Sequence, residues 1–116
     1  MDYKLWEYQG RSPVADEIER ELKNDPRSSK MIVSAGKRFE KYTYEELCKA
    51  QKVEKLKGNN PHKIHEFRID LFKKIARFLF VVDGSSLAIF LNFFIKKTRK
   101  ISDTNKSIAE KRAGLI

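Results

Sequence analysis

The clearest pattern of apolar and polar positions lies in the second half of the chain. Over residues 65–72, apolar side chains occupy every second position and charged ones lie between them, which predicts a half-buried β-strand. Residues 75–82 and 87–95 are apolar on both faces, as is typical of central strands. The Asp83-Gly84 pair between them predicts a hairpin turn. A short strand-like piece, residues 52–57, precedes these strands.

Helical signals dominate the first half of the chain. An aromatic-rich stretch, residues 3–8, predicts a first strand, and Ser12-Pro13 then has the residue types that begin a helix. Asp25-Pro26 repeats this start signal for a second helix. Thr43 and Glu46 have the spacing of a capping box, which predicts a short third helical segment. Near the C-terminus, Ser102 or Asp103 predicts the start of a last helix.

Together these elements predict a small α+β sandwich of one domain, residues 1–116. The expected order is β-α-α-β-β-β-β-α, with the helices packed on one face of a mostly antiparallel sheet. A hydrophobic content of 41% in 116 residues is sufficient for a folded core and argues against disorder. A single cysteine, Cys48, excludes an intrachain disulfide framework and fits a reducing compartment such as the cytoplasm.

Strand geometry makes a specific prediction about two arginines. A two-residue turn at Phe72-Lys73 would place Arg68 directly opposite Arg77 on neighbouring strands. A two-residue turn in the next hairpin would place Arg77 opposite Phe90, with Asn92 as its diagonal neighbour on the same face. A four-residue turn would leave Arg77 and Asn92 on the same face, whereas a three-residue turn would place them on opposite faces.

Facing arginines need a counter-charge. Like charges directly opposite each other are unfavourable by up to ~1 kcal/mol. An anion bound between the two guanidinium groups would offset this cost, and phosphate matches their geometry. The alternative is that each arginine pairs with Glu66, Asp70 or an acidic residue of a helix.

The charge distribution narrows the choice of partner. Residues 1–50 hold ten Lys/Arg and ten Asp/Glu, whereas residues 51–116 hold fifteen and six, so the net charge of +9 lies in the second part. Cations held on a sheet favour a polyanionic partner, most simply nucleic acid. The turn within residues 78–95 argues against a membrane span there, and the polar, aromatic start gives no secretory signal.

Several ordered pieces of the chain resemble one family. They are Gly10-Arg11-Ser12-Pro13-Val14 after the first strand, Lys55-Leu56-Lys57-Gly58 before the sheet, Glu66-Phe67-Arg68-Ile69, Arg77 nine residues after Arg68, Phe94-Ile95-Lys96-Lys97-Thr98-Arg99-Lys100, and Ile108-Ala109 with Arg112. This set resembles the RelE/HigB superfamily of bacterial and phage toxins, in particular its HigB-like, phage-derived branch. Two departures are Asn92, where many HigB-like proteins have histidine, and Ile101-Ser102, where Thr-Pro is usual.

The resemblance implies an endoribonuclease that cuts mRNA in the ribosomal A site, inhibits translation and arrests growth. In that reaction the RNA 2′-hydroxyl attacks the adjacent phosphate, and neither a metal nor another cofactor is needed. It assigns Lys55 or Lys57 as base or phosphate clamp and Arg68 to the transition state. Arg77, or a cation of the Lys96-Lys97 pair, would assist the leaving group or anchor a flanking phosphate. The remaining expected site residues are His65 and Glu66 as reserves for proton transfer, and Lys96, Lys97, Arg99, Lys100 and Asn92 as RNA contacts.

The resemblance also implies the partners. A cognate antitoxin, expected to be a helix-turn-helix protein from a neighbouring gene, would neutralise the toxin and would provide the only link to operator DNA. No membrane partner is expected. Two alternatives remain open from the residues: a non-catalytic RelE-like module that binds nucleic acid or protein, which Asn92 favours because an amide cannot act as a general base, and a basic module held by an acidic partner.

Overall fold

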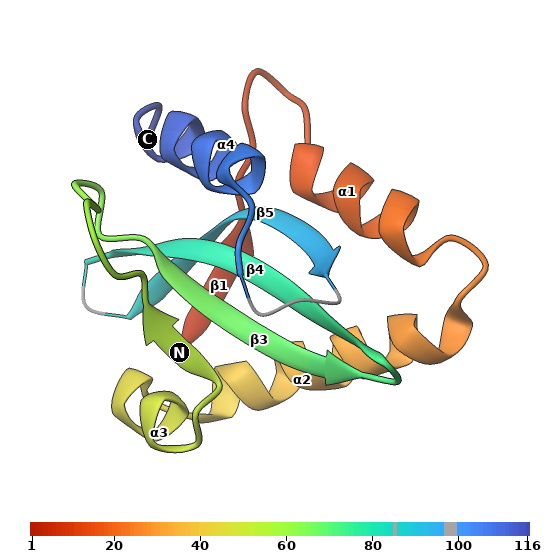
Figure 1. Cartoon of the computed structure of the whole chain (residues 1–116). Helices are drawn as coiled ribbons and strands as arrows, with labels where there is room; N and C mark the ends of the chain where they lie inside the picture. The colour runs from red at the N-terminus through yellow and green to blue at the C-terminus, as the bar shows by residue number, and fades with distance from the viewer. Residues whose placement is uncertain (85, 97–99) are drawn as a thin grey trace.

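The computed structural model describes residues 1–84, 86–96 and 100–116. Its elements, in chain order, are β1 (Asp2–Leu5), α1 (Pro13–Leu22), α2 (Pro26–Lys41), α3 (Tyr44–Lys49), β2 (Val53–Lys55), β3 (His65–Leu71), β4 (Lys74–Asp83), β5 (Leu87–Lys96) and α4 (Asp103–Ala113). The α+β class and the mostly antiparallel sheet are confirmed (Figure 1). The third helical segment is a separate helix, begun by the capping box that Thr43 and Glu46 form.

A single sheet of five strands lies at the centre of the molecule. Its strand order is β1-β5-β4-β3-β2, and all neighbours are antiparallel except β1, which runs parallel to β5. The meander from β2 to β5 therefore follows the chain, and the first strand joins it at the far edge. Because β1 pairs only with residues 87–90, the second half of β5 has an edge that another element must cover.

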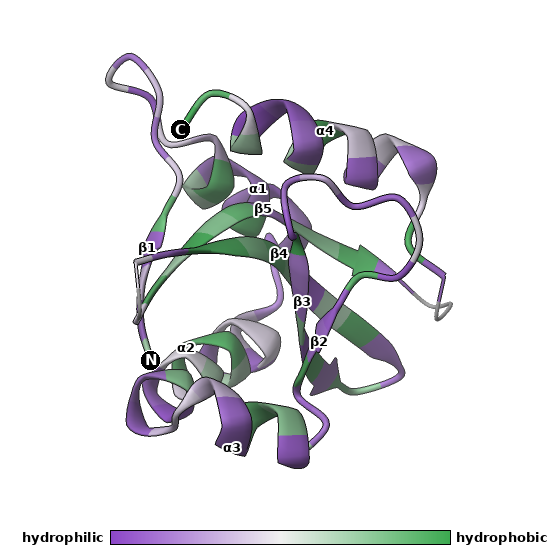
Figure 2. Ribbon diagram, turned by 90° about the vertical axis from the view of Figure 1, so that its left-hand side faces the viewer, coloured by the Kyte–Doolittle hydropathy of each residue, from purple (hydrophilic) through white to green (hydrophobic). Residues whose placement is uncertain are grey.

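The helices are distributed around this sheet. Figures 1 and 2 place α2 and α3 on one face and α4 across the other, while α1 runs along the edge of β5 beyond β1. The apolar strands of Figure 2 thus lie between two layers whose outer surfaces are polar. In the described part of the chain, no helix is both long enough and apolar enough to span a bilayer.

Phe39 of α2 is the centre of the core beneath the first of these faces. Its ring is fully buried and lies 4.8 Å from Phe67, 5.3 Å from Phe90 and 5.8 Å from Phe80, measured between ring centroids. These rings come from three adjacent strands, so a single helical side chain contacts the middle of the sheet. Burial of aromatic area at this point stabilises the α2–sheet packing.

The predicted register of β3 and β4 is confirmed. Leu71 pairs with Lys74 across the two-residue turn, and Arg68 pairs with Arg77. Lys73 adopts a positive φ of 61°, the left-handed conformation that closes this turn. The turn forms although neither of its residues is glycine or asparagine.

The predicted register of β4 and β5 is wrong, although its conclusion about faces holds. Asp83 pairs with Leu87, so the connection has three residues and not two, and Arg77 lies opposite Phe94 and not Phe90. A register shift next to Leu79, which pairs with Asn92, adds one more residue on β5. The three-residue turn reverses which β5 residues share a face with Arg77, and the extra residue at the bulge reverses this again. Arg77 and Asn92 are therefore diagonal neighbours on one face, as predicted.

Candidate functional site

The two facing arginines share one carboxylate. Glu66 Oε1 lies 3.3 Å from Arg68 Nε and 3.8 Å from Arg77 Nε. All three side chains lie on the α4 side of the sheet, because they occupy alternate positions to the residues that contact Phe39. The Glu66 side chain therefore takes the place where the sequence predicted a bound anion, and the alternative of pairing with Glu66 is realised.

Exposure separates the roles of the two arginines. The Arg68 side chain is 34% exposed, whereas that of Arg77 is 1% exposed and that of Glu66 is 9% exposed. Arg68 also lies 3.8 Å from Glu54 and donates a hydrogen bond of 3.4 Å to the Gln51 carbonyl. Arg68 is thus the arginine that a ligand in solvent can reach, and Arg77 holds Glu66 from within the protein.

The protonation of Glu66 is perturbed by its surroundings. Burial raises the pKa of its carboxyl above the ordinary value, and the positive charges of Arg77 and Arg68 oppose that rise. A carboxylate with a raised pKa is a stronger base than an ordinary one, which suits it to accept a proton from a substrate.

A cleft of about 520 Å³ opens beside Glu66 and is bordered by cations. Its polar lining consists of Glu54, Lys55, Lys57, Glu66, Lys100 and Lys106. Four of these residues, Lys55, Lys57, Glu66 and Lys100, are among the predicted site residues. They come from β2, β3 and the segments that follow β2 and precede α4, so the fold brings together positions far apart in the sequence.

Two residues of the cleft were missed by sequence reasoning. Glu54 lies 3.9 Å from Lys57 as well as close to Arg68, and it faces Glu66 across β2 and β3. Lys106 of α4 donates to the Asn59 carbonyl at 3.4 Å. Strand alternation gives a weak indication that Glu54 belongs to the cleft, because it places Glu54 on the same face as Glu66. For Lys106 the sequence offers only its positive charge, because the position of α4 over the sheet depends on tertiary packing.

Asn92 is sealed beneath α4. It is 1% exposed, and its Nδ2 donates a hydrogen bond of 3.0 Å to the Asn105 carbonyl. Asn105 in turn donates to the Ser102 side chain that caps α4. The contact of Asn92 in this structure is therefore with the helix that covers the arginine face.

The other predicted residues are dispersed. His65 lies on the α3 face, where its ring stacks on Phe80 at 5.2 Å and meets Tyr44 edge-on at 5.2 Å. Of the two reserve groups for proton transfer, only Glu66 thus faces the arginines. Lys96 is half-buried at the end of β5, and Lys97 and Arg99 lie outside the described residues.

Comparison with known proteins adds a family to this geometry. The model of the family described as "Phage derived protein Gp49-like" matches residues 20–114. The chain belongs to the Gp49-like family. A search of curated proteins gave no match.

The Gp49-like match covers the part of the chain that builds the site. It extends from the end of α1 through α4 and includes both arginines, Glu66 and every residue of the cleft. The Gp49-like family is associated with toxin–antitoxin systems, so this chain is a phage-derived, toxin-like protein for which an antitoxin partner is implied.

Proposed function

We propose that this Gp49-like chain is a RelE/HigB-like toxin that cleaves mRNA in the ribosomal A site. The observation that carries the proposal is a buried carboxylate, Glu66, held by two arginines at the wall of a cleft bordered by lysines. The family's association with toxin–antitoxin systems and the resemblance of the ordered motifs support the same function. The net charge of +9 favours approach to ribosomal RNA.

The proposed chemistry needs three groups. Glu66 accepts the proton of the 2′-hydroxyl, whose oxygen attacks the adjacent phosphorus and forms the 2′,3′-cyclic phosphate. Arg68, the accessible arginine, stabilises the negative charge that develops on the phosphorane. The bond to the 5′-oxygen breaks, and a lysine ammonium of the cleft donates the proton that this oxygen needs.

The lysines of the cleft have a second task. Lys57 and Lys100 are exposed and lie where a flanking phosphate would bind, while Lys106 reaches the cleft from α4. Lys55 or Lys57 remains the alternative base, because both ammonium groups border the same cleft as Glu66. Arg77 is a positioning residue in this scheme, since its contact is with Glu66 inside the fold.

The test is cleavage during cell-free translation of a reporter mRNA, with new 5′ ends mapped by primer extension. Wild type is compared with Glu66→Gln and Arg68→Ala, and Lys23→Ala, an exposed residue outside the cleft, is the control for lost positive charge. We expect cuts that require translating ribosomes and that fall about a hundredfold with Glu66→Gln. Full cleavage by both variants would overturn the assignment of the site.

A second candidate function follows from Asn92 and its burial under α4. A non-catalytic member of the family would bind the ribosome or RNA through the same basic face without cutting it. Blocked protein synthesis with intact mRNA would favour this candidate. Continued synthesis with intact mRNA would overturn both.

A further inference from the structure

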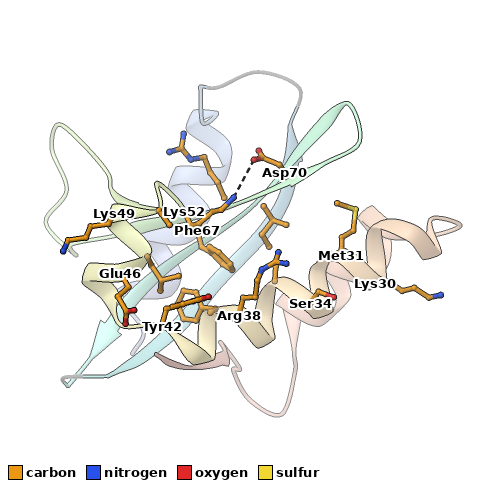
Figure 3. Close-up of a pocket in the computed structure, with 16 residues that line it drawn as sticks. Lys30, Met31, Ser34, Arg38, Tyr42, Glu46, Lys49, Lys52, Phe67 and Asp70 are labelled. Carbon is orange, nitrogen blue, oxygen red and sulfur yellow. Dashed lines mark ion pairs between the residues drawn. The ribbon is translucent and has the colours of Figure 1, made fainter.

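A second hollow of the described structure lies on the other side of β3 from the cleft. It is a groove of about 820 Å³ between α2, α3 and β3, lined by the side chains drawn in Figure 3. Its floor is apolar and consists of Met31, Ala35, Phe39, Leu47, Phe67 and Ile69. An apolar hollow of this size at the surface marks a binding site more often than a packing defect.

The rim of this groove is basic. Five cations border it, Lys30, Arg38, Lys49, Lys52 and Arg68, against two carboxylates, Glu46 and Asp70. Lys52 is paired with Asp70 at 3.9 Å, the contact dashed in Figure 3, and Arg68 is held by Glu66 and Glu54.

Three cations of the rim are left for a ligand. Lys30, Arg38 and Lys49 are exposed and take part in no ion pair with the described residues. The rim thus presents an excess of positive charge around an apolar floor, which complements an acidic ligand that also carries an apolar face.

The sheet edge beside the groove is open. β2 pairs with residues 65–67 of β3, and the last backbone bond on this side runs from the Arg68 N–H to the Lys52 carbonyl at 2.9 Å. In the described part of the chain, no strand pairs with the β2 side of β3 from there to Leu71, while β4 pairs with its other side. An open edge next to apolar surface is normally covered by another element.

We propose that this groove is the docking site for an acidic amphipathic helix of the antitoxin. The proposal rests on the toxin–antitoxin function but not on nuclease activity. The side of the groove formed by α2, from Lys30 to Phe39, is about 14 Å long at 1.5 Å per residue, which matches a helix of about ten residues. Its apolar stripe would contact the floor, and its flanking carboxylates would pair with Lys30, Arg38 and Lys49.

The apolar floor favours a peptide over RNA as the occupant. Nucleic acid is bound by cations along its backbone and by aromatic faces on which bases stack. Here Phe39 and Phe67 are 0% and 4% exposed, so neither ring of the floor presents a face to a base, and the exposed Tyr42 ring offers a stacking face to one base but not to successive bases. Aliphatic side chains of a helix need only the shallow apolar surface that this groove provides.

The test uses two designed, fluorescein-labelled helical peptides of about 14 residues, with the same leucine stripe and either glutamate or lysine on its flanks. Binding to the full chain is measured by fluorescence anisotropy. The rim is reversed in Arg38→Glu/Lys49→Glu. The matched control is Lys37→Glu/Lys41→Glu, which changes the same charge at exposed positions of α2 outside the groove.

We expect the acidic peptide to bind wild type with a dissociation constant in the micromolar range and to bind the reversed rim about tenfold more weakly. The control should stay within about twofold, and the lysine peptide should prefer the reversed rim. Equal binding of both peptides, an equal loss in the control, or no binding at about 1 mM would overturn the proposal. So would displacement of the acidic peptide by a single-stranded RNA whose binding depends on Arg38 and Lys49.

The outcome is separable from that of the nuclease proposal. Peptide binding is measured without RNA or ribosomes, so a chain that cuts no mRNA can still bind the acidic peptide. Conversely, the reversed rim lies outside the cleft and should retain translation-dependent cleavage. Matching urea midpoints of the reversed rim and the control would establish that both variants are folded.

Discussion

A buried ion pair joins three elements of the fold and can be tested directly. The Glu17 carboxylate of α1 forms an ion pair with Arg112 of α4 at 2.9 Å, and it accepts hydrogen bonds from Arg112 at 3.2 Å and from the Phe93 N–H of β5 at 3.0 Å. Arg112 also donates to the Leu91 carbonyl at 2.7 Å. The Glu17 and Arg112 side chains are only 11% and 16% exposed, so solvent screens the pair little.

The expected cost of Glu17→Ala follows from these contacts. Removing one partner of a buried ion pair costs about 3–5 kcal/mol, because the other charge stays buried without compensation. The Phe93 N–H also loses its acceptor, which by itself costs about 1–3 kcal/mol and overlaps with the first loss. We therefore expect a decrease of about 4 kcal/mol in the free energy of unfolding, a large part of the stability of a domain of this size.

Urea unfolding measures this cost, and the chain contains a local reporter. The Arg112 guanidinium lies 5.2 Å from the centre of the Trp6 ring, so tryptophan fluorescence reports on the pair while circular dichroism reports on the whole fold. Arg112→Ala and the double variant complete a double-mutant cycle. The double variant should lower the free energy of unfolding by about 2 kcal/mol less than the sum of the two single variants. Glu21→Ala, at an exposed position of the same helix, should stay within about 0.5 kcal/mol. A cost below about 1 kcal/mol for Glu17→Ala, or strict additivity, would refute the reasoning.

Three further predictions follow from single contacts. Cleavage by wild type should fall as pH decreases through the raised pKa of Glu66, with a midpoint above the ordinary value of about 4.3, and Glu66→Gln should abolish this dependence in a pH–rate profile. Burial and the Lys55 ammonium lower the pKa of His65, so the neutral ring contributes to the free energy of unfolding, and this contribution is lost as pH falls below about 6.5. In urea titrations above and below that pH, His65→Phe should therefore show a smaller decrease in the free energy of unfolding than wild type. A Cβ at Gly36 would lie 2.6 Å from the Tyr3 hydroxyl, so Gly36→Ala should cost about 1 kcal/mol, and combination with Tyr3→Phe should recover most of it in thermal unfolding.

The register of β3 and β4 could be predicted because two simple rules determine it. Alternation fixed the faces of β3, and a two-residue turn left one pairing in which Arg68 faces Arg77. The same reasoning failed between β4 and β5. A three-residue connection and a bulge next to Leu79 are set by the packing of the apolar faces, and no residue type at those positions announces them.

Only the part of the candidate site that β3 and β4 form could be predicted from the sequence. Glu66 was included as a reserve group, and its place between the arginines follows from the confirmed register. The cover that α4 places over Asn92 could not be predicted, because α4 has a single buried apolar residue, Ala109, and no amphipathic stripe to show which face it contacts. The basic groove between α2, α3 and β3 is likewise a product of tertiary packing.

The shared carboxylate explains how one site can hold two facing arginines and still act on a phosphate. In the resting protein Glu66 offsets the repulsion between Arg68 and Arg77 that their direct pairing creates. In the proposed reaction, the proton that Glu66 takes from the 2′-hydroxyl removes this negative charge. Arg68 is released from its ion pair at the step in which negative charge accumulates on the phosphorane, so proton transfer and transition-state stabilisation reinforce each other. Glu66→Gln separates the two effects, because the amide removes the Glu66 charge from Arg68 from the start and leaves Arg68 its ion pair with Glu54. It should therefore bind a non-cleavable RNA at least as tightly as wild type while it fails to cut the normal substrate, and weaker binding of that RNA would contradict the coupling.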